Sequence, residues 1–251
     1  MAALVRKLMF NPPRCGRGTV PRDAFVLRAC HPVYARYVAP PRSRCAVLYS
    51  HGTAETLIGK VDFVDAMAKR LNVAVLAYEY CGYGCSDGEP NEACVLGAAD
   101  AALRWLRRRW PADRIVLWGN SLGSGPTCYL AQCSEPLGGL VLESAFLSTY
   151  ELAKDYAGLL APLLASLAPL LALFAPIDAF PNRAWLAQAE QVPALVIHGL
   201  RDATIPPRHG RSLARQLDAA TWYPWAGHDH LDRLPDYWPT LRRWFQALPL
   251  R

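Results

Sequence analysis

The sequence has no internal repeat and no long polar linker, although its 251 residues would suffice for two small domains. That absence predicts a single domain spanning residues 1–251, and a hydrophobic fraction of 52% supplies enough apolar side chains for one sizeable core. The cysteines lack the spacing of a disulfide framework, so we expect reduced thiols in a cytoplasmic protein. The first residues also lack the long apolar run of a secretory signal and the glycine that myristoylation requires.

Strong charge of one sign is absent too, because 27 Lys and Arg against 21 Asp and Glu give a formal net charge of only +6. Part of the excess lies in one cluster, Arg104, Arg107, Arg108, Arg109 and Arg114. Such a cluster can attract anionic lipid headgroups or RNA, but the solvated end of a helix is the simpler interpretation. The sequence contains no nucleic-acid motif with interleaved aromatic residues. We therefore expect no nucleic-acid partner.

Metal-binding spacings are missing from the two most suggestive pairs. Cys81 and Cys85 flank a Gly-Tyr-Gly turn at a spacing that fits neither a zinc knuckle nor a redox pair. His228 and His230 could ligate a metal, yet no third ligand follows at a matching distance. We expect neither a metal nor an organic cofactor.

Short apolar runs do recur along the chain, and most are separated by segments with helical periodicity. The runs are residues 46–50, 73–80, 115–118, 140–143, 194–198 and 221–225. Helices are expected at 59–71, 92–110, 124–134, 206–217 and 235–247. This alternation predicts an α/β fold with a mostly parallel central sheet and helices on both faces, and residues 25–38 are expected to add antiparallel edge strands.

Residues 157–177 carry no charge and are long enough on paper to cross a bilayer. A single crossing would place the strand before Ser121 and the strand ending at His198 on opposite sides of the membrane, so the sheet could not form. Pro162, Pro169 and Pro176 also interrupt a continuous helix. We predict two short, proline-broken helices lying over the sheet, within a lid-like insertion at 146–182. They would either wall an acyl-chain pocket, with peripheral membrane contact, or simply pack on the core.

The segment Gly119–Gly123 fits the G-x-S-x-G pattern of a nucleophile elbow. Residues 114–118 before it are typical of a buried strand, and residues 124–134 after it of a helix. This strand-to-helix context is what the motif requires, since the turn pushes the serine hydroxyl out of the sheet. Ser121 is thus the candidate nucleophile; the alternative is that it only caps the following helix.

A serine hydroxyl needs a base held by a carboxylate, and in this fold the acid precedes the histidine in the chain. Asp202 follows the run 194–198, and His228 follows the last predicted strand. Both therefore lie at carboxyl ends of strands, where open parallel sheets place their ligands. His230 competes for the role of base. Asp178 is the second choice of acid, but it precedes a strand instead of following one.

Acyl transfer also needs backbone donors for the developing oxyanion. The amide of Leu122, directly after the nucleophile, is the first expected donor. The loop after residues 46–50 supplies the second, which points to the amide of Thr53. His51 in the same loop is expected to shape the turn and not to act as a base.

With these residues in place, the chain resembles the α/β-hydrolase family over nearly its whole length. Residues 7–13, 80–86 and 178–182 and the turns at 198–199 and 226–228 look like the abhydrolase branch that includes protein depalmitoylases. The resemblance implies a serine esterase or thioesterase acting on a long-chain acylated small molecule or protein. Two features depart from that branch: Cys15 stands alone where those proteins carry an N-terminal cysteine cluster, and the apolar stretch before Asp178 is longer.

Other functions remain open at this stage. A carboxylesterase or lysophospholipase, or a serine peptidase, would use the same catalytic residues. A receptor that keeps the fold and binds a ligand without turnover is the alternative from another class.

Overall fold

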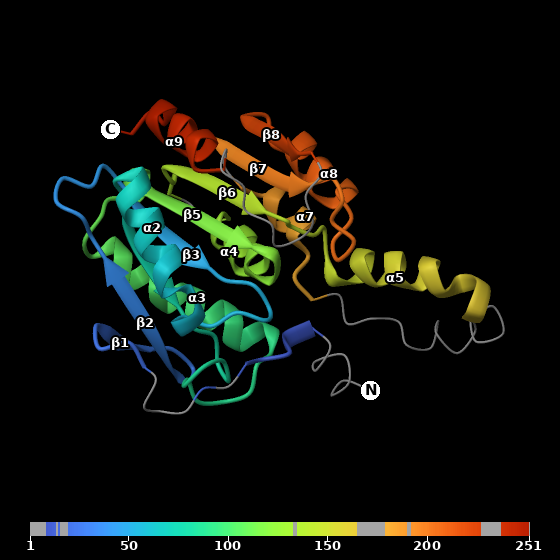
Figure 1. Ribbon diagram of the computed structural model, residues 1–251, viewed down its shortest axis with the longest axis horizontal. Helices are drawn as coiled ribbons and strands as arrows, with labels where there is room; N and C mark the ends of the chain where they lie inside the picture. The colour runs from blue at the N-terminus through green and yellow to red at the C-terminus, as the bar shows by residue number, and fades with distance from the viewer. Residues whose placement is uncertain are drawn as a thin grey trace.

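A computed structural model describes residues 9–13, 15, 20–132, 135–164, 179–189, 192–226 and 237–250, with only the backbone described for 157–164. In these ranges one eight-stranded sheet has the order β1-β2-β4-β3-β5-β6-β7-β8 (Figure 1). Its strands are β1 (Ala24–Arg28), β2 (Pro32–Val38), β3 (Ala46–Ser50), β4 (Ala74–Tyr78), β5 (Ile115–Asn120), β6 (Gly139–Glu143), β7 (Ala194–Gly199) and β8 (Ala220–Trp225). Strands β4, β3, β5, β6, β7 and β8 run parallel, and β2 pairs antiparallel with both β1 and β4. The predicted sheet and its antiparallel edge are confirmed.

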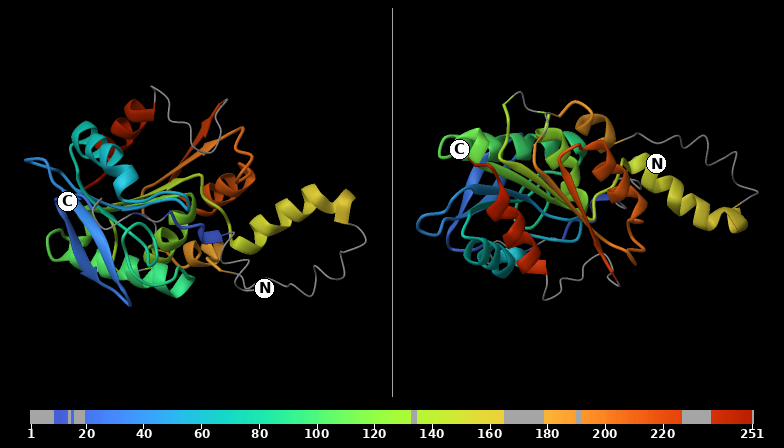
Figure 2. Two further views of the ribbon diagram at one scale, coloured as in Figure 1. Left: turned by 60° about the horizontal axis from the view of Figure 1, so that its bottom comes forward. Right: turned by 90° about the horizontal axis from the view of Figure 1, so that it is seen from above.

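Helices cover both faces of this sheet (Figures 1 and 2). The helices on the two faces are α2 (Val61–Leu71), α3 (Glu92–Arg107), α4 (Ser124–Leu130), α7 (Asn182–Leu186), α8 (Arg208–Gln216) and α9 (Tyr237–Ala247), whereas α5 (Thr149–Leu164) projects from the body. Apolar side chains of α2 and α9 form one core layer, and those of α3, α4, α7 and α8 form the other. Neighbours along a strand alternate between the layers, as Leu48 and Tyr49 of β3 do. All five residues of β3 are buried, as expected for a strand covered on both sides.

The register brings the carboxyl ends of the parallel strands to one edge of the sheet. Ser50 of β3 pairs with Gly119 of β5, and Asn120 pairs with Glu143 of β6. Residues that directly follow β3, β5 and β7 must then lie close together, although they are far apart in the sequence.

The prediction for the apolar segment is wrong in two respects where it can be followed. α5 continues past Pro162 to Leu164, so this proline does not end the helix. Its helix does not lie over the sheet but extends away from the body (Figures 1 and 2). Pro169 and Pro176 lie outside the described residues.

Two further findings concern helix length. α4 ends at Leu130, four residues earlier than the periodicity predicts. Among the helices described, none has the length and apolarity required to span a bilayer.

Candidate active site

Ser121 occupies a sharp turn between a strand and a helix. It follows β5 directly, begins the short 3-10 helix η4 (Ser121–Gly123), and has a φ of 52°. The left-handed region is unfavourable for a residue with a Cβ and is held here by the surrounding structure. The turn is therefore the strained elbow that the G-x-S-x-G motif predicts.

The two glycines of the motif are required because other groups approach them closely. A Cβ on Gly119 would collide with the carbonyl of Gly123 and the hydroxyl of Thr127. A Cβ on Gly123 would collide with the carbonyl of Ser50 on the neighbouring strand β3. The predicted steric need for both glycines is confirmed.

A buried hydrogen-bond network fixes the elbow from below. Ser124 Oγ donates to the Ser121 carbonyl at 2.7 Å, and Asn182 Nδ2 donates to Ser124 Oγ at 3.3 Å and to the Phe146 carbonyl at 2.9 Å. Asn182 begins α7, a helix that the periodicity of the sequence does not predict. Its amide ties that helix, the loop after β6 and the nucleophile turn together.

A cavity of about 430 Å³ opens beside Ser121. Both predicted oxyanion donors, Leu122 and Thr53, line it together with the serine. Met9, Phe146, Leu152 and Ile205 contribute apolar side chains to the remaining lining. The volume falls within the range of about 300–1,000 Å³ that is usual for small-molecule sites. The structure thus places Ser121, Leu122 and Thr53 around one largely apolar cavity.

Two polar side chains in the cavity wall were not predicted from the sequence. Asn120, the variable residue of the motif, is 1% exposed, and its amide has no hydrogen-bond partner among the described residues. Glu55 accepts a hydrogen bond from Gly52 N at 2.8 Å and pairs with Lys60. Burial alone would raise the pKa of Glu55, but the Lys60 ammonium and the Gly52 amide outweigh it and lower that pKa. Glu55 therefore braces the loop of Thr53 as a carboxylate.

His51 has the contacts of a residue that shapes this loop, as predicted. Its Nδ1 lies 2.9 Å from the Gly52 carbonyl, and its Nε2 lies 3.2 Å from a carboxylate oxygen of Glu79. The Tyr80 hydroxyl donates to the His51 carbonyl at 2.7 Å, and the two rings lie 4.2 Å apart. Both ring nitrogens of His51 thus face acceptors inside the protein.

Asp202 lies directly behind the cavity wall. Its Oδ1 accepts the amides of Thr204 at 2.9 Å and Ile205 at 2.8 Å, and both of these residues line the cavity. Its Oδ2 lies 3.4 Å from His198 Nε2, which donates to the Ile205 carbonyl at 2.7 Å. The carboxylate is thereby held at the same edge of the sheet as Ser121.

The predicted base, His228, lies outside the described residues, as do His230 and Asp178. The structure describes the chain up to Ala226 and again from Tyr237. Leu200 N donates to the Trp225 carbonyl at 2.9 Å, so β8 ends beside the loop that carries Asp202. The Ser121–His228–Asp202 triad remains a prediction.

The base of α5 forms the other side of the cavity. Thr149, Leu152 and Tyr156 line it, and the Tyr156 hydroxyl donates to the Thr204 carbonyl at 2.6 Å. Asp155 on the same helix lies 2.6 Å from His209 Nε2 of α8. Burial lowers the pKa of His209 more than the Asp155 carboxylate raises it. A neutral His209 therefore joins α5 to α8, which local periodicity cannot show because the partners are distant in sequence.

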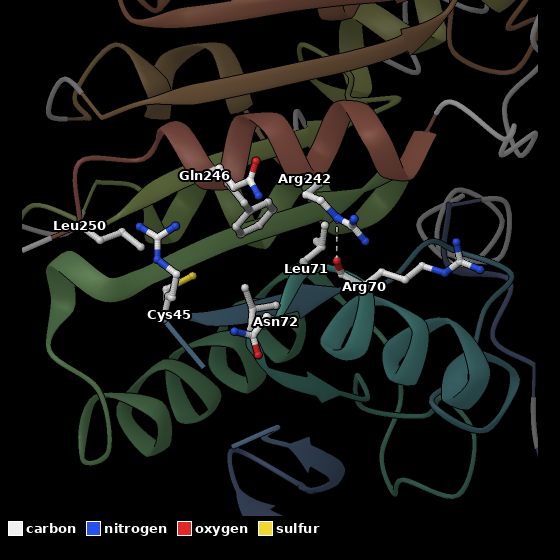
Figure 3. A pocket seen from close by; sticks show the side chains of 10 residues that line it. Cys45, Arg70, Leu71, Asn72, Arg242, Gln246 and Leu250 are labelled. Atoms are coloured by element: carbon white, nitrogen blue, oxygen red, sulfur yellow. Dashed lines mark hydrogen bonds between the residues drawn. The ribbon is translucent and has the colours of Figure 1, made fainter. Parts of the chain in front are cut away.

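A second hollow, of about 290 Å³, lies at the opposite edge of the sheet (Figure 3). Cys45 and Val73, the residues before β3 and β4, line it together with Arg44, Arg70 and Arg242. Arg242 Nε donates to the Arg70 carbonyl at 3.2 Å. None of the predicted catalytic residues that the structure describes lines this hollow, so it is separate from the cavity at Ser121.

Comparison with known proteins agrees with this arrangement. Residues 41–184 match the family model described as Hydrolase_4, serine aminopeptidase, S33. The α/β hydrolase domain-containing protein aho-3 of Caenorhabditis elegans is 32% identical over 207 residues, which cover 80% of this chain and 58% of that protein. The α/β hydrolase domain-containing protein 17C of Mus musculus is 30% identical over 208 residues, which cover 81% of this chain and 60% of that protein. The chain thus spans less than two thirds of the length of these relatives.

Solved structures show the same fold at low sequence identity. The esterase Pf2001 of Pyrococcus furiosus superposes with a TM-score of 0.71 at 16% identity, covering 96% of this chain and 98% of that one. An α/β serine hydrolase homologue from Coxiella burnetii gives 0.62 at 17% identity, covering 90% and 96%. Together with the match to more than half of its residues, the elbow and the sheet establish that this chain belongs to the α/β-hydrolase family, in the abhydrolase-domain branch.

Proposed function

We propose that this protein is a serine hydrolase that cleaves an acyl ester or thioester through an acyl-enzyme. Ser121 attacks the carbonyl carbon, His228 takes the serine proton and returns it to the leaving group, and Asp202 orients the imidazole. The amides of Leu122 and Thr53 stabilise the tetrahedral oxyanion. Water then attacks the acyl-enzyme and releases the acid.

The strained backbone of Ser121 is the observation on which this proposal depends. A φ of 52° at a non-glycine residue is costly, and a serine that only capped α4 would not need it. The strain aims the residue at a cavity that both candidate oxyanion donors line. This arrangement favours turnover over a receptor that only binds a ligand.

The lining of the cavity favours an acyl chain on one side of the scissile bond. Met9, Phe146, Leu152 and Ile205 offer an apolar wall, whereas Asn120 offers a buried amide close to the nucleophile. A thioester of a long-chain acylated small molecule or protein fits this division. The description of the matched family makes a serine peptidase the second candidate, and it would use the same elbow on an amide bond.

A fluorophosphonate probe tests the nucleophile. Wild-type protein should be labelled at Ser121, and Ser121→Ala should abolish both labelling and turnover while the thermal unfolding curve stays close to that of the wild type. Ser212→Ala is the matched control, because this serine lies on α8 and does not line the cavity. A folded wild-type protein that no probe concentration labels would refute the enzyme and support a receptor.

Matched substrates then separate the bond types. A thioester, an oxygen ester and an amide with the same acyl group should be compared by kcat/KM at several chain lengths. We expect hydrolysis of the thioester and ester to exceed that of the amide, with KM falling as the chain lengthens. An amide preference would assign the peptidase instead.

A further inference from the structure

Three cysteine thiols from separate parts of the chain meet at one point on the sheet edge of β1 and β2. Cys30 lies in the turn between these two strands, Cys81 follows β4, and Cys94 lies in the first turn of α3. Their sulfur atoms all lie within 4.8 Å of one another, with 3.2 Å between Cys30 and Cys94 and 3.5 Å between Cys30 and Cys81. Residue spacing did not reveal this cluster. Cys81 is near Cys85 along the chain, but in the folded protein it lies close to Cys30 and Cys94, which are distant in sequence.

We propose that Cys30, Cys81 and Cys94 bind one soft d10 metal cation of the Zn²⁺ class as thiolates, at a site separate from the Ser121 cavity. Each thiol releases its S–H proton to solvent as its sulfur bonds to the metal. Cys30 is exposed whereas the other two are buried, so water completes the coordination from the side of Cys30.

The sulfur separations favour a metal over a disulfide. Three sulfurs at about 2.3 Å from a zinc ion lie roughly 3.8–4.0 Å apart, whereas a disulfide needs about 2.05 Å. The observed 3.2 and 3.5 Å therefore have to open by only about half an ångström to admit a cation. A disulfide would need a closure of more than about 1 Å and would leave the third thiol unused.

The surroundings also favour a cation. Three adjacent thiolates repel one another, and a bound cation is what makes them stable together. Asn91, the N-cap of α3, positions Cys94 by accepting its amide at 2.9 Å and donating to its sulfur at 3.6 Å.

A metal bound here would also stabilise the loop that carries His51 and Thr53. Tyr80, next to Cys81, donates to the carbonyl of His51, and the Tyr83 ring lies 5.5 Å from the His51 ring. Binding would link the β1–β2 turn, the segment after β4 that carries Cys81, and α3, so it should stabilise the folded protein.

Titration with Cd²⁺ tests the site, since cadmium–thiolate bonds absorb in the ultraviolet. Reduced, metal-free protein should give a saturating signal at one Cd²⁺ per chain, and Zn²⁺ should compete for the site and raise the melting temperature. Cys30→Ser, at an exposed position, should weaken binding by at least about tenfold and remove the thermal shift. Cys85→Ser is the matched control, because Cys85 lies in the same loop and bonds to the Cys15 carbonyl, outside the cluster.

Three results would overturn the proposal. They are wild-type protein without saturable binding, Cys30→Ser binding as tightly as the wild type, and equal losses in Cys30→Ser and Cys85→Ser. A Cys30–Cys94 disulfide formed under mild peroxide, in protein that binds cadmium no better than Cys30→Ser does, would assign the cluster a redox function instead. Loss of fluorophosphonate labelling plays no part in this test, so the site and the hydrolase can fail independently.

Discussion

Asp202→Asn isolates the contribution of one carboxylate, because the substitution keeps the shape of the side chain and removes its charge. The asparagine oxygen can still accept the amides of Thr204 and Ile205, which now lie 2.8–2.9 Å from Oδ1. Those two hydrogen bonds lose their charge assistance, at a cost of about 1 kcal/mol each. The new NH₂ group would also face His198 Nε2 from 3.4 Å, where two donors oppose each other. We expect unfolding free energy to fall by about 2–3 kcal/mol in total.

Turnover should fall far more than this destabilisation accounts for. An amide in place of the carboxylate stabilises the wrong tautomer of the base, which in comparable triads lowers kcat about 10⁴-fold. That factor corresponds to roughly 5.5 kcal/mol of transition-state stabilisation. The loss of stability and the loss of kcat can be separated by a thioester assay at a temperature at which chemical denaturation shows that the variant is folded.

His198→Gln is the matched comparison, because glutamine can still donate to the Ile205 carbonyl. It should lose stability by a similar amount yet keep kcat within about tenfold of the wild type. An Asp202→Asn enzyme that also stays within tenfold would show that another carboxylate orients the base, and the assignment of Asp202 would be wrong.

Three further substitutions, the first with a control, test contacts around the cavity. Gly123→Ala should destabilise by more than about 3 kcal/mol because its Cβ overlaps a backbone carbonyl, whereas Gly97→Ala in α3 meets only an ordinary contact at 3.7 Å and should be neutral or stabilising by thermal unfolding. The pKa of His209 in the folded protein lies below its unfolded value of 6.5, so the free energy of unfolding should fall as pH drops through 6.5. His209→Gln should flatten that dependence in denaturant titrations between pH 7.5 and 5.5. An unchanged slope would contradict the neutral pairing of His209 with Asp155. Tyr156→Phe removes one hydrogen bond to the cavity wall and should cost about 1 kcal/mol of stability, with a rise in KM; an unchanged KM would separate α5 from substrate binding.

The positions of the strands along the chain and the elbow could be predicted because both depend on local sequence. Apolar runs such as 194–198 match β7 closely, since a strand covered on both faces must be apolar throughout. The glycines around Ser121 mark a turn without room for side chains, and that requirement is visible in five consecutive residues.

The course of the apolar segment could not be predicted in the same way. Its lack of charge and its prolines suggested short helices over the sheet, but α5 runs through Pro162, and Tyr156 near its base contacts the Thr204 carbonyl. What holds that base is the contact of Asp155 with Arg208 and His209, more than fifty residues away. No periodicity within the segment contains that information.

The sequence by itself determined the family, the alternation of strands and helices, and the residue at which a nucleophile could stand, because each of these depends on the chemistry of neighbours along the chain. Only the tertiary structure decided that Glu55 and Asn120 would face the cavity, that α5 would form its far wall, and that three separate thiols would meet. The physical reason is that parallel strands bring their ends to one edge whatever lies between them in sequence, so the contacts made there depend on register and packing.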